Sequence, residues 1–323
     1  MTQKTIMMVT GAIEPSADTL VLELERRGAR VARVLPSRLA SGLSMRFAFD
    51  AGGTTGSFRD QAFDFRIEDV TGVWYRLTEE PALPDSLSDD ERRFARRESR
   101  TALLGAWGMI PGLWVNDPMA IAKANLKFHQ MQEARRLGLR TPKTLVTNDP
   151  ADAERFYEEL GGRMVFKTLS QGMWRAARGN PHVAPVTPDQ LGRLKTLLPG
   201  CPAMFQQHIE KTLELRATVI GRRVFTAAIH SQESEATRHD WRGNVHKVRH
   251  TVFELPADVE RKLLGMMDAF GLHYAAADFI LSPEGEFWFL DFNPQGQFGW
   301  IEDMTGLPLH GAVADLLTSG QAG

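Results

Sequence analysis

Cysteine, long apolar runs and an excess of charge of either sign are all scarce in this 323-residue sequence. Its single cysteine, Cys201, excludes an internal disulfide framework and fits a reducing cytoplasm, where this thiol is expected to be structural. The start of the chain shows no signal peptide, and no stretch is apolar enough to span a membrane. A net charge of −2 predicts no bulk attraction to nucleic acid or to a membrane surface. We therefore expect a cytoplasmic protein with neither of these partners.

Length and composition are those of an ordinary globular protein, with 43% hydrophobic and 24% charged residues. The chain is long enough for two or three lobes, and neither repeats nor low-complexity segments occur. A strand–helix–strand beginning over 5–35 predicts a parallel unit of the α/β class, although its TGAIEP loop lacks the GxGxxG spacing of dinucleotide-binding folds. The character of the sequence changes between 120 and 140. We expect domains at 1–120, 121–205 and 206–323.

Two features of the first domain bear on function. Ser88 is expected to cap a charged helix that ends at Trp107, and its ERRFARRESR run is more typical of a solvated face than of a nucleic-acid patch. Arg76 closes an apolar strand, so its guanidinium should emerge at the strand end. There it would be either a snorkelled surface group or a contact for an anionic substrate.

The stretch 272–300, LHYAAADFILSPEGEFWFLDFNPQGQFGW, is the most informative in the chain. Two apolar runs, 275–281 and 287–292, flank a turn-rich segment and predict a β-hairpin. A four-residue loop would pair residue 282 with residue 287, and the same register places Asp278 opposite Asp291. Strand alternation then brings Asn293 to their face, so that hard oxygen ligands suited to Mg²⁺ and substrate phosphates converge.

Other interpretations of this hairpin stay open. The acids could be ordinary surface residues of an edge hairpin. A bulged turn at Gly285 would slip the register by one residue and turn the two carboxylates to opposite faces. The metal site therefore needs support from residues elsewhere in the chain.

That support lies upstream, in groups suited to a nucleotide. Lys127, in a helix expected to run from Pro118 to about residue 137, and Lys167, at a strand end, could each neutralise phosphate charge. Each lysine taken alone is more often a surface residue. Arg216 and Arg242 offer planar forks to a carboxylate or to a transferring phosphoryl group. Residues 206–209 (Gln206, Gln207, His208 and Ile209) end an apolar strand whose backbone could contact an adenine edge. Glu214 follows at a distance suited to accepting hydrogen bonds from ribose hydroxyls.

The order of these residues resembles that of the ATP-grasp ligases, in which two lobes clamp ATP. RimK-like glutamate ligases share the helix lysine, the strand lysine, the glutamine-rich hinge, acidic-x-Arg, Trp-Arg-x-Asn and the closing Asp and acid-x-Asn. A closer resemblance is to the graspetide macrocyclases, the microviridin-type peptide maturases of the MvdD-like group. It is carried by VWYRL at 73–77, VNDPMAIAKANLKFHQMQEARRLGL, SQES, DWRG and FNPQGQFGWIEDMTGLPL.

This resemblance covers nearly the whole chain and implies an ATP-grasp fold of α+β lobes behind an N-terminal pre-ATP-grasp α/β domain. Asp291 departs from the wider superfamily, which more often has glutamate there. VWYRL carries leucine where many relatives have a second arginine, and the loop 169–180 is only sparsely glycine-rich.

The function that the resemblance implies is ATP-dependent ligation of carboxylates. Asp or Glu side chains of a ribosomally made precursor peptide would be activated as acyl phosphates and closed into intramolecular esters or amides. ATP and Mg²⁺ are the implied cofactors, a peptide with a leader and an acidic core is the implied partner, and a homodimer is a further expectation. Arg216 and Arg242 would be catalytic, and Arg76, His230 and Asn244 are expected to contact substrate. Two alternatives remain: a RimK-like ligase that adds a free amino acid to a peptide or metabolite, and a non-catalytic ATP-binding module.

Overall fold

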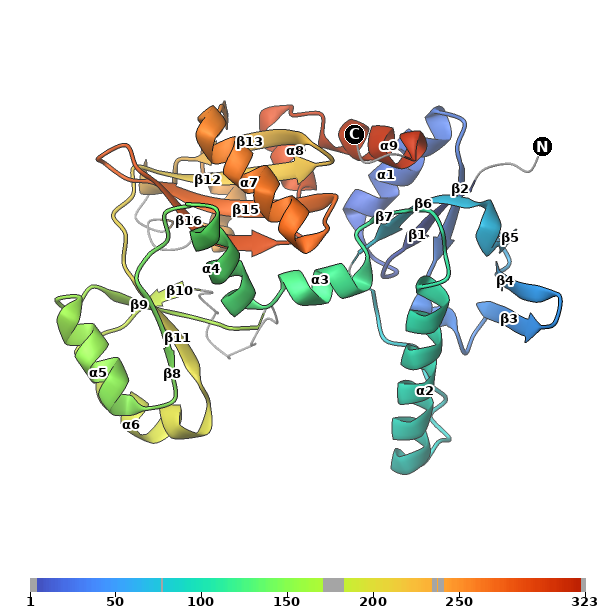
Figure 1. Cartoon of the computed structure of the whole chain (residues 1–323), viewed down its shortest axis with the longest axis horizontal. Helices are drawn as coiled ribbons and strands as arrows, with labels where there is room; N and C mark the ends of the chain where they lie inside the picture. The colour runs from blue at the N-terminus through green and yellow to red at the C-terminus, as the bar shows by residue number, and fades with distance from the viewer. Residues whose placement is uncertain (1–4, 77, 171–182, 234–236, 238–240, 321–323) are drawn as a thin grey trace.

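The computed structural model describes residues 5–76, 78–170, 183–233, 237 and 241–320, with backbone alone for residues 183 and 242–244. Its strands form four sheets, and its helices cover their faces (Figure 1). The sheet of the N-terminal part lies at one end of the molecule, and two further sheets lie at the other end, one above the other. No helix in these ranges has both the length and the apolar character that a membrane crossing needs.

The N-terminal part is a parallel sheet with strand order β2-β1-β6-β7, as the strand–helix–strand pattern predicts. A small antiparallel sheet of β3, β4 and β5 is inserted between β2 and β6. Ser88 forms a capping box with Glu91 at the start of α2, which confirms the predicted cap. The elements of this part are β1 (Thr5–Val9), α1 (Pro15–Arg26), β2 (Arg30–Val34), β3 (Ser44–Asp50), β4 (Gly53–Arg59), β5 (Asp64–Arg66), β6 (Val70–Tyr75), α2 (Asp89–Trp107) and β7 (Leu113–Val115).

The segment after β7 differs from the single helix expected to about residue 137. It forms two helices, α3 (Pro118–Ala124) and α4 (Lys127–Arg136), with Asn125 as the C-cap of the first. Gln130 donates from its side chain to the carbonyl of Ala124 at 2.6 Å and to that of Phe292 at 2.7 Å, so it joins the break to the far strand of the C-terminal sheet. The break makes Lys127 the first residue of α4, at the edge of a cavity.

The middle of the chain builds an antiparallel sheet with strand order β10-β9-β11-β8, which two helices cover on one face. Its core contains Ala153, Met164 and Phe205, all buried. The segment 171–180, most of the loop expected to be sparse in glycine, lies outside the described residues. The elements are β8 (Thr144–Thr147), α5 (Pro150–Glu159), β9 (Met164–Lys167), β10 (Val183–Pro185), α6 (Pro188–Leu197) and β11 (Ala203–Gln207).

The C-terminal part is a five-stranded antiparallel sheet with order β14-β13-β12-β15-β16, and α7 packs on its apolar face. The helix α7 ends at Gly271, whose φ of 66° provides a left-handed C-cap. The elements are β12 (Leu213–Ile220), β13 (Arg223–Ile229), β14 (His250–Phe253), α7 (Ala257–Phe270), β15 (Tyr274–Leu281), β16 (Phe287–Asn293), α8 (Gly299–Thr305) and α9 (Leu309–Ser319).

The last helix returns to the first sheet. Leu309, Val313 and Leu317 of α9 share one hydrophobic core with Leu20 and Leu24 of α1, and Figure 1 shows the two helices side by side. The domain limits expected from the sequence stay a prediction, but the core of the N-terminal sheet includes a helix from the segment assigned to the third domain.

Candidate active site

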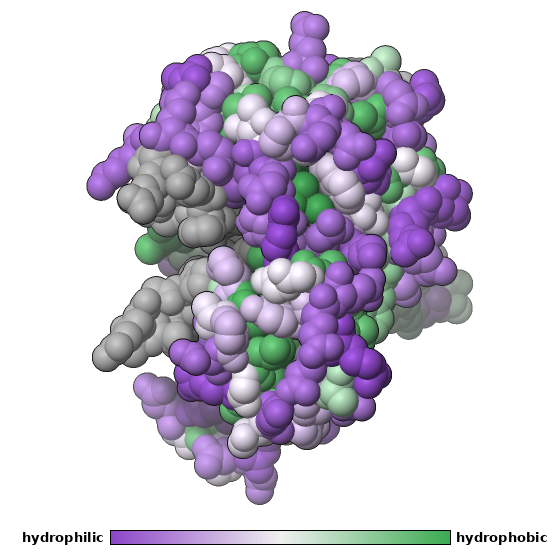
Figure 2. Space-filling view, turned by 90° about the vertical axis from the view of Figure 1, so that its left-hand side faces the viewer, coloured by the Kyte–Doolittle hydropathy of each residue, from purple (hydrophilic) through white to green (hydrophobic). Residues whose placement is uncertain are grey.

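A cavity of about 230 Å³ lies between the middle sheet and the C-terminal sheet. Figure 2 shows the corresponding face, with a hollow between the upper and lower parts of the molecule. Segments far apart in the sequence meet here, because β9 and β11 supply one wall and β12, β15 and β16 the other. The predicted residues that line the cavity are Lys127, Lys167, Gln206, Gln207, His208, Ile209, Glu214, Arg216, Asp278, Asp291 and Asn293.

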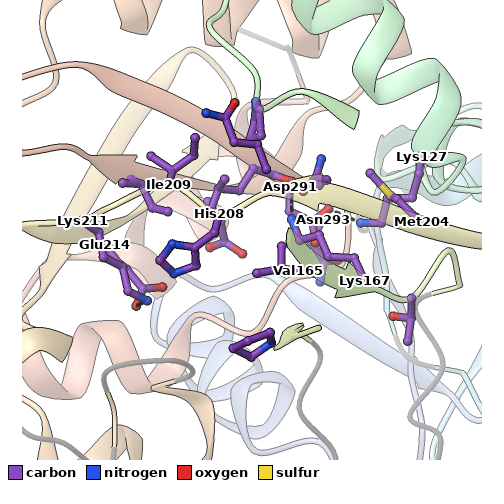
Figure 3. Close-up of a pocket in the computed structure, with 18 of the residues that line it drawn as sticks. Lys127, Val165, Lys167, Met204, His208, Ile209, Lys211, Glu214, Asp291 and Asn293 are labelled. Atoms are coloured by element: carbon purple, nitrogen blue, oxygen red, sulfur yellow. Dashed lines mark hydrogen bonds and ion pairs between the residues drawn. The ribbon is translucent and has the colours of Figure 1, made fainter. Parts of the chain in front are cut away.

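The cavity has chemically distinct ends. Figure 3 shows Glu214 and Lys211 at one end and Lys127 at the other, with Asp291 between them. Glu214 accepts hydrogen bonds from Lys211 Nζ at 2.6 Å and from Ser231 Oγ at 2.8 Å. Both of these partners were missed in the sequence, although Lys211 stands three residues before Glu214 and that spacing was available as a signal. The two hydrogen bonds hold the Glu214 carboxylate in place near the start of β12.

The turn of the hairpin corrects the predicted register. Ser282 N donates to Glu286 O at 3.0 Å, and Gly285 has a φ of 80°, so the loop has three residues and not four. Leu281 therefore pairs with Phe287, one residue out of the predicted register. This is the slip that would turn Asp278 and Asp291 to opposite faces.

A β-bulge reverses the slip before the acids are reached. Phe279 pairs with Phe289 but Asp278 pairs with Asp291, so Leu290 is the extra residue. The predicted pairing of the two aspartates is thus confirmed. It results from two shifts of register that cancel, one at the turn and one at the bulge, and not from the regular pairing that the sequence predicts. Strand alternation from Asp291 then places Asn293 on the same face.

Two cations hold the two acids. Arg216 faces Asp278 across β12 and β15, and its Nη1 donates to Asp278 Oδ1 at 2.8 Å. Lys127 Nζ donates to Asp291 Oδ1, while Lys167 Nζ donates to the carbonyl of the bulged residue, Leu290, at 3.0 Å. Arg216 and Asp278 are only 7% and 9% exposed, so the attraction between them is weakly screened.

The donor set on this face fits a Mg²⁺ ion. Asp278, Asp291 and Asn293 present two carboxylates and one amide, and Mg²⁺ binds one or two carboxylates while it takes further ligands from water and phosphate. Among the described residues, no cluster contains three or more histidine, cysteine or carboxylate side chains able to hold an ion.

The strand end expected to read an adenine edge is partly occupied by the fold itself. The backbone N–H of Gln207 donates to Lys143 O at 2.9 Å, and that of His208 donates to Arg163 O at 2.9 Å. Gln206 is buried, and its Nε2 donates to Thr144 Oγ1 at 2.9 Å. The backbone N–H groups of 207 and 208 are thus engaged within the fold, while all four residues of 206–209 line the cavity, and their contact with an adenine edge stays a prediction.

Arg76 does not lie where the sequence suggested. Its side chain is 1% exposed, so the expectation that the guanidinium emerges at the strand end is wrong. It lies among Trp74, Tyr274 and Phe298, because the C-terminal part of the chain covers the end of β6. Burial raises the pKa of Tyr274, with Arg76 and Arg216 opposing that rise.

The remaining residues expected to contact substrate are His230 and Asn244. His230, at the end of β13, contacts Thr251 Oγ1 at 3.1 Å and Arg249 Nη2 at 2.8 Å and does not line the cavity. Burial and the neighbouring Arg249 lower the pKa of His230. Arg242 and Asn244 fall in the 3₁₀-helix Arg242–Lys247, and their side chains are outside the described part of the chain.

Comparisons with known proteins point to one kind of enzyme. Residues 6–122 match the family model described as the MvdD pre-ATP grasp domain. The macrocyclase MdnC of Microcystis aeruginosa MRC, solved with the precursor peptide MdnA, is 31% identical with a TM-score of 0.86 and covers 98% of this chain and 99% of its own. A RiPP-associated ATP-grasp ligase of Chryseobacterium gregarium, solved with ADP and a leader and core peptide, is 29% identical with a TM-score of 0.89, over 99% of this chain and 98% of its own.

A more distant relative is the ribosomal protein bS6–L-glutamate ligase of Escherichia fergusonii. It is 25% identical over 218 residues, which is 66% of this chain and 70% of that protein. The match is thus less extensive than the two structural ones.

Proposed function

Because this chain belongs to the graspetide-type ATP-grasp ligases, we propose that it activates Asp or Glu side chains of a ribosomally made precursor peptide with ATP. The activated carboxylates then close into intramolecular ester or amide cross-links. The observation that best supports this proposal is that one cavity is lined by two lysines, by the Glu214 carboxylate and by Arg216. In the same cavity Arg216 pairs across the strands with Asp278, which in turn pairs with Asp291.

The proposed reaction has two steps, phosphorylation of a carboxylate and ring closure. A carboxylate oxygen of the peptide takes the γ-phosphoryl group of ATP, which gives an acyl phosphate and ADP. A hydroxyl or amine of the same peptide then attacks the carbonyl carbon and loses a proton, and phosphate leaves. The peptide therefore loses one water for each ring, and each turnover yields ADP and phosphate.

The described residues have matching roles. Lys127 and Lys167 would neutralise phosphate charge, and Glu214 would accept hydrogen bonds from the ribose hydroxyls, a proposal supported by their position in the cavity lining. Arg216 holds the carboxylate and its acyl phosphate, because its buried guanidinium is oriented by Asp278. We assign the same role to Arg242, from the resemblance alone.

Asp278, Asp291 and Asn293 would hold Mg²⁺. The ion, when bound, supplies Lewis-acid stabilisation of the charge on the transferring phosphoryl group.

The proposal also covers the peptide substrate, the cellular compartment and the oligomeric state. We expect a peptide with a leader that supplies affinity and an acidic core that moves through the site. A short disordered core loses conformational entropy when it binds, so its own affinity is low and a separate leader is needed. The lone cysteine, exposed on the surface, supports a reducing cytoplasm. We further expect a homodimer, which light scattering of the purified protein would test.

Mass spectrometry tests the proposed function directly. The protein is incubated with ATP, Mg²⁺ and a candidate precursor peptide, and we expect a loss of one water per ring with release of phosphate. A gain of one amino acid residue when free glutamate is added would establish the RimK-like alternative. Nucleotide binding with no modification of any candidate peptide and no ADP formation would favour the non-catalytic module. Asp291→Asn serves as the control for chemistry, because it should retain nucleotide through the lysines and form no rings.

A further inference from the structure

We propose that Arg76 is a positioning residue of the N-terminal domain, which acts through the backbone of Gly296 on Arg216 in the active site. The proposal deepens the proposed function and rests on it, because it assumes that Arg216 handles the reacting carboxylate. It replaces the expectation that Arg76 itself contacts the substrate. The domain that precedes the clamp would then set the geometry of the reaction in addition to any role in substrate binding.

The first observation is how closely the chain approaches Arg216 after β16. A Cβ atom added to Gly296 would lie 2.6 Å from Arg216 Nη2 and 2.6 Å from the Cβ of Ala276. The backbone at residue 296 therefore packs directly on the guanidinium, on a side of it that Asp278 does not hold. Any movement of this backbone changes the space that is open to Arg216.

The second observation is what holds that backbone. Arg76 Nη1 donates to Gly296 O at 2.9 Å, and the Tyr274 hydroxyl donates to the same carbonyl. The neighbouring Gln297 donates from Nε2 to Glu14 Oε1 at 3.3 Å, and the same Glu14 oxygen is 3.6 Å from Arg76 Nε. Two residues of the N-terminal domain thus hold two successive residues of the segment beside Arg216.

The third observation is that the Arg76 guanidinium is buried with two of its three nitrogens lacking a hydrogen-bond partner among the described atoms. Arg76 is 1% exposed, and the two nitrogens are Nε and Nη2. A buried guanidinium with one hydrogen bond and a carboxylate beyond hydrogen-bond distance is less favourable than an apolar side chain of similar volume. The contact between the domains does not require it, because Arg27 of α1 already bonds Gly311 O of α9 at 3.2 Å.

The test compares Arg76→Met with Arg27→Met, a matched control that removes another arginine–carbonyl contact between the same parts of the chain. We expect Arg76→Met to lower kcat by about a hundredfold, the effect of a reacting group misplaced by about 1 Å, with KM for ATP almost unchanged. Arg76→Lys should restore part of kcat because it keeps a donor for Gly296 O. Gly296→Ala, with Arg76 intact, should produce the same loss of kcat because its Cβ displaces Arg216.

Crystal structures of these variants with ADP decide the matter independently of any peptide. We expect the backbone of 294–297 and the Arg216 guanidinium to move together in Arg76→Met and in Gly296→Ala, and to stay in place in Arg27→Met. A loss of kcat in Arg76→Met with Arg216 unmoved would overturn the proposal in favour of a direct role of Arg76. So would a native kcat, or equal losses in the two arginine variants. If the wild-type protein modified no peptide, the proposed function would fail, while the positions of Gly296 and Arg216 would still decide this inference. Arg76→Lys and Gly296→Ala keep the test valid if Arg76→Met does not fold.

Discussion

The buried pair of Arg216 and Asp278 allows a quantitative test of the site. We consider Asp278→Asn, which removes the negative charge but keeps the volume, Arg216→Met, and the double variant. The side chains of Arg216 and Asp278 are only 8% and 12% exposed, and the two polar groups lie 2.8 Å apart. Asp291 has Lys127 as its own partner, so loss of the Asp278 charge leaves the Arg216 guanidinium without an ion-pair partner in the part of the chain that the structure describes.

The expected magnitude follows from that burial. Breaking a buried ion pair from one side costs about 3–5 kcal/mol, and we expect about 3 kcal/mol here because both groups line a cavity that is open to water. The double variant leaves no buried charge from this pair, so its loss should fall short of the sum of the single losses by about 2–3 kcal/mol. The unfolding temperature of each single variant should fall by roughly 6–12 °C if the lobes unfold together, since 1 kcal/mol corresponds to about 2–4 °C when about 150–250 residues unfold as one unit.

The assay is thermal unfolding of the four proteins without nucleotide, together with ring formation as a separate measurement. Asp268→Asn is the matched control, because it breaks an Arg–Asp pair with Arg222 whose side chains are 64% and 47% exposed. Such an exposed pair contributes less than about 1 kcal/mol. Additive losses in the double variant, or a loss in Asp278→Asn no larger than in the control, would refute the reasoning. All three variants at the cavity should fail to form rings.

Three further outcomes are expected. Glu214→Ala should raise KM for ATP by about tenfold or more, because a bond to a charged acceptor contributes about 1.5–3 kcal/mol, and an unchanged KM would contradict the ribose assignment. Lys127→Met should weaken ATP binding in calorimetry by a similar factor of about ten, whereas Lys143→Met, at an exposed pair, should not; equal effects would argue against a phosphate contact. Burial lowers the pKa of His250 in the folded protein, so below the ordinary histidine pKa of 6.5 the unfolded state binds more protons and stability should fall as pH decreases. His250→Gln should reduce that fall in unfolding temperature between about pH 7.5 and pH 5.5, and an identical fall would show that His250 is not its source.

Local signals in the sequence predicted the elements well where short-range forces decide them. Ser88 caps α2 because its own side chain and that of Glu91 satisfy the free amides of the first turn. The order of lysines and acids, together with Arg216, became meaningful through the resemblance, and these residues line one wall or the other of the cavity.

The hairpin shows how a correct prediction can rest on incomplete geometry. The aspartates pair as expected, but only because a three-residue turn and a bulge at Leu290 shift the register in opposite directions. Contacts from distant segments accompany the bulge: Lys167 bonds Leu290 O at 3.0 Å, and Arg140 O accepts from Phe289 N at 2.8 Å. Nothing in the two strands themselves specifies these partners, so the bulge could not be placed from the hairpin sequence.

What the sequence determined by itself was most of the elements, the class of fold and most of the residues that meet at the cavity, because those depend on local propensity and on motif order. Tertiary structure decided the surroundings of each group. Arg76 closes a strand that looked exposed, yet the segment around Gly296, 220 residues later, covers it and gives it a carbonyl to bind. The helix α9 likewise packs into the core of the N-terminal sheet, although it comes from the end of the chain. Burial of a side chain depends on which distant segment covers it, and no local pattern carries that information.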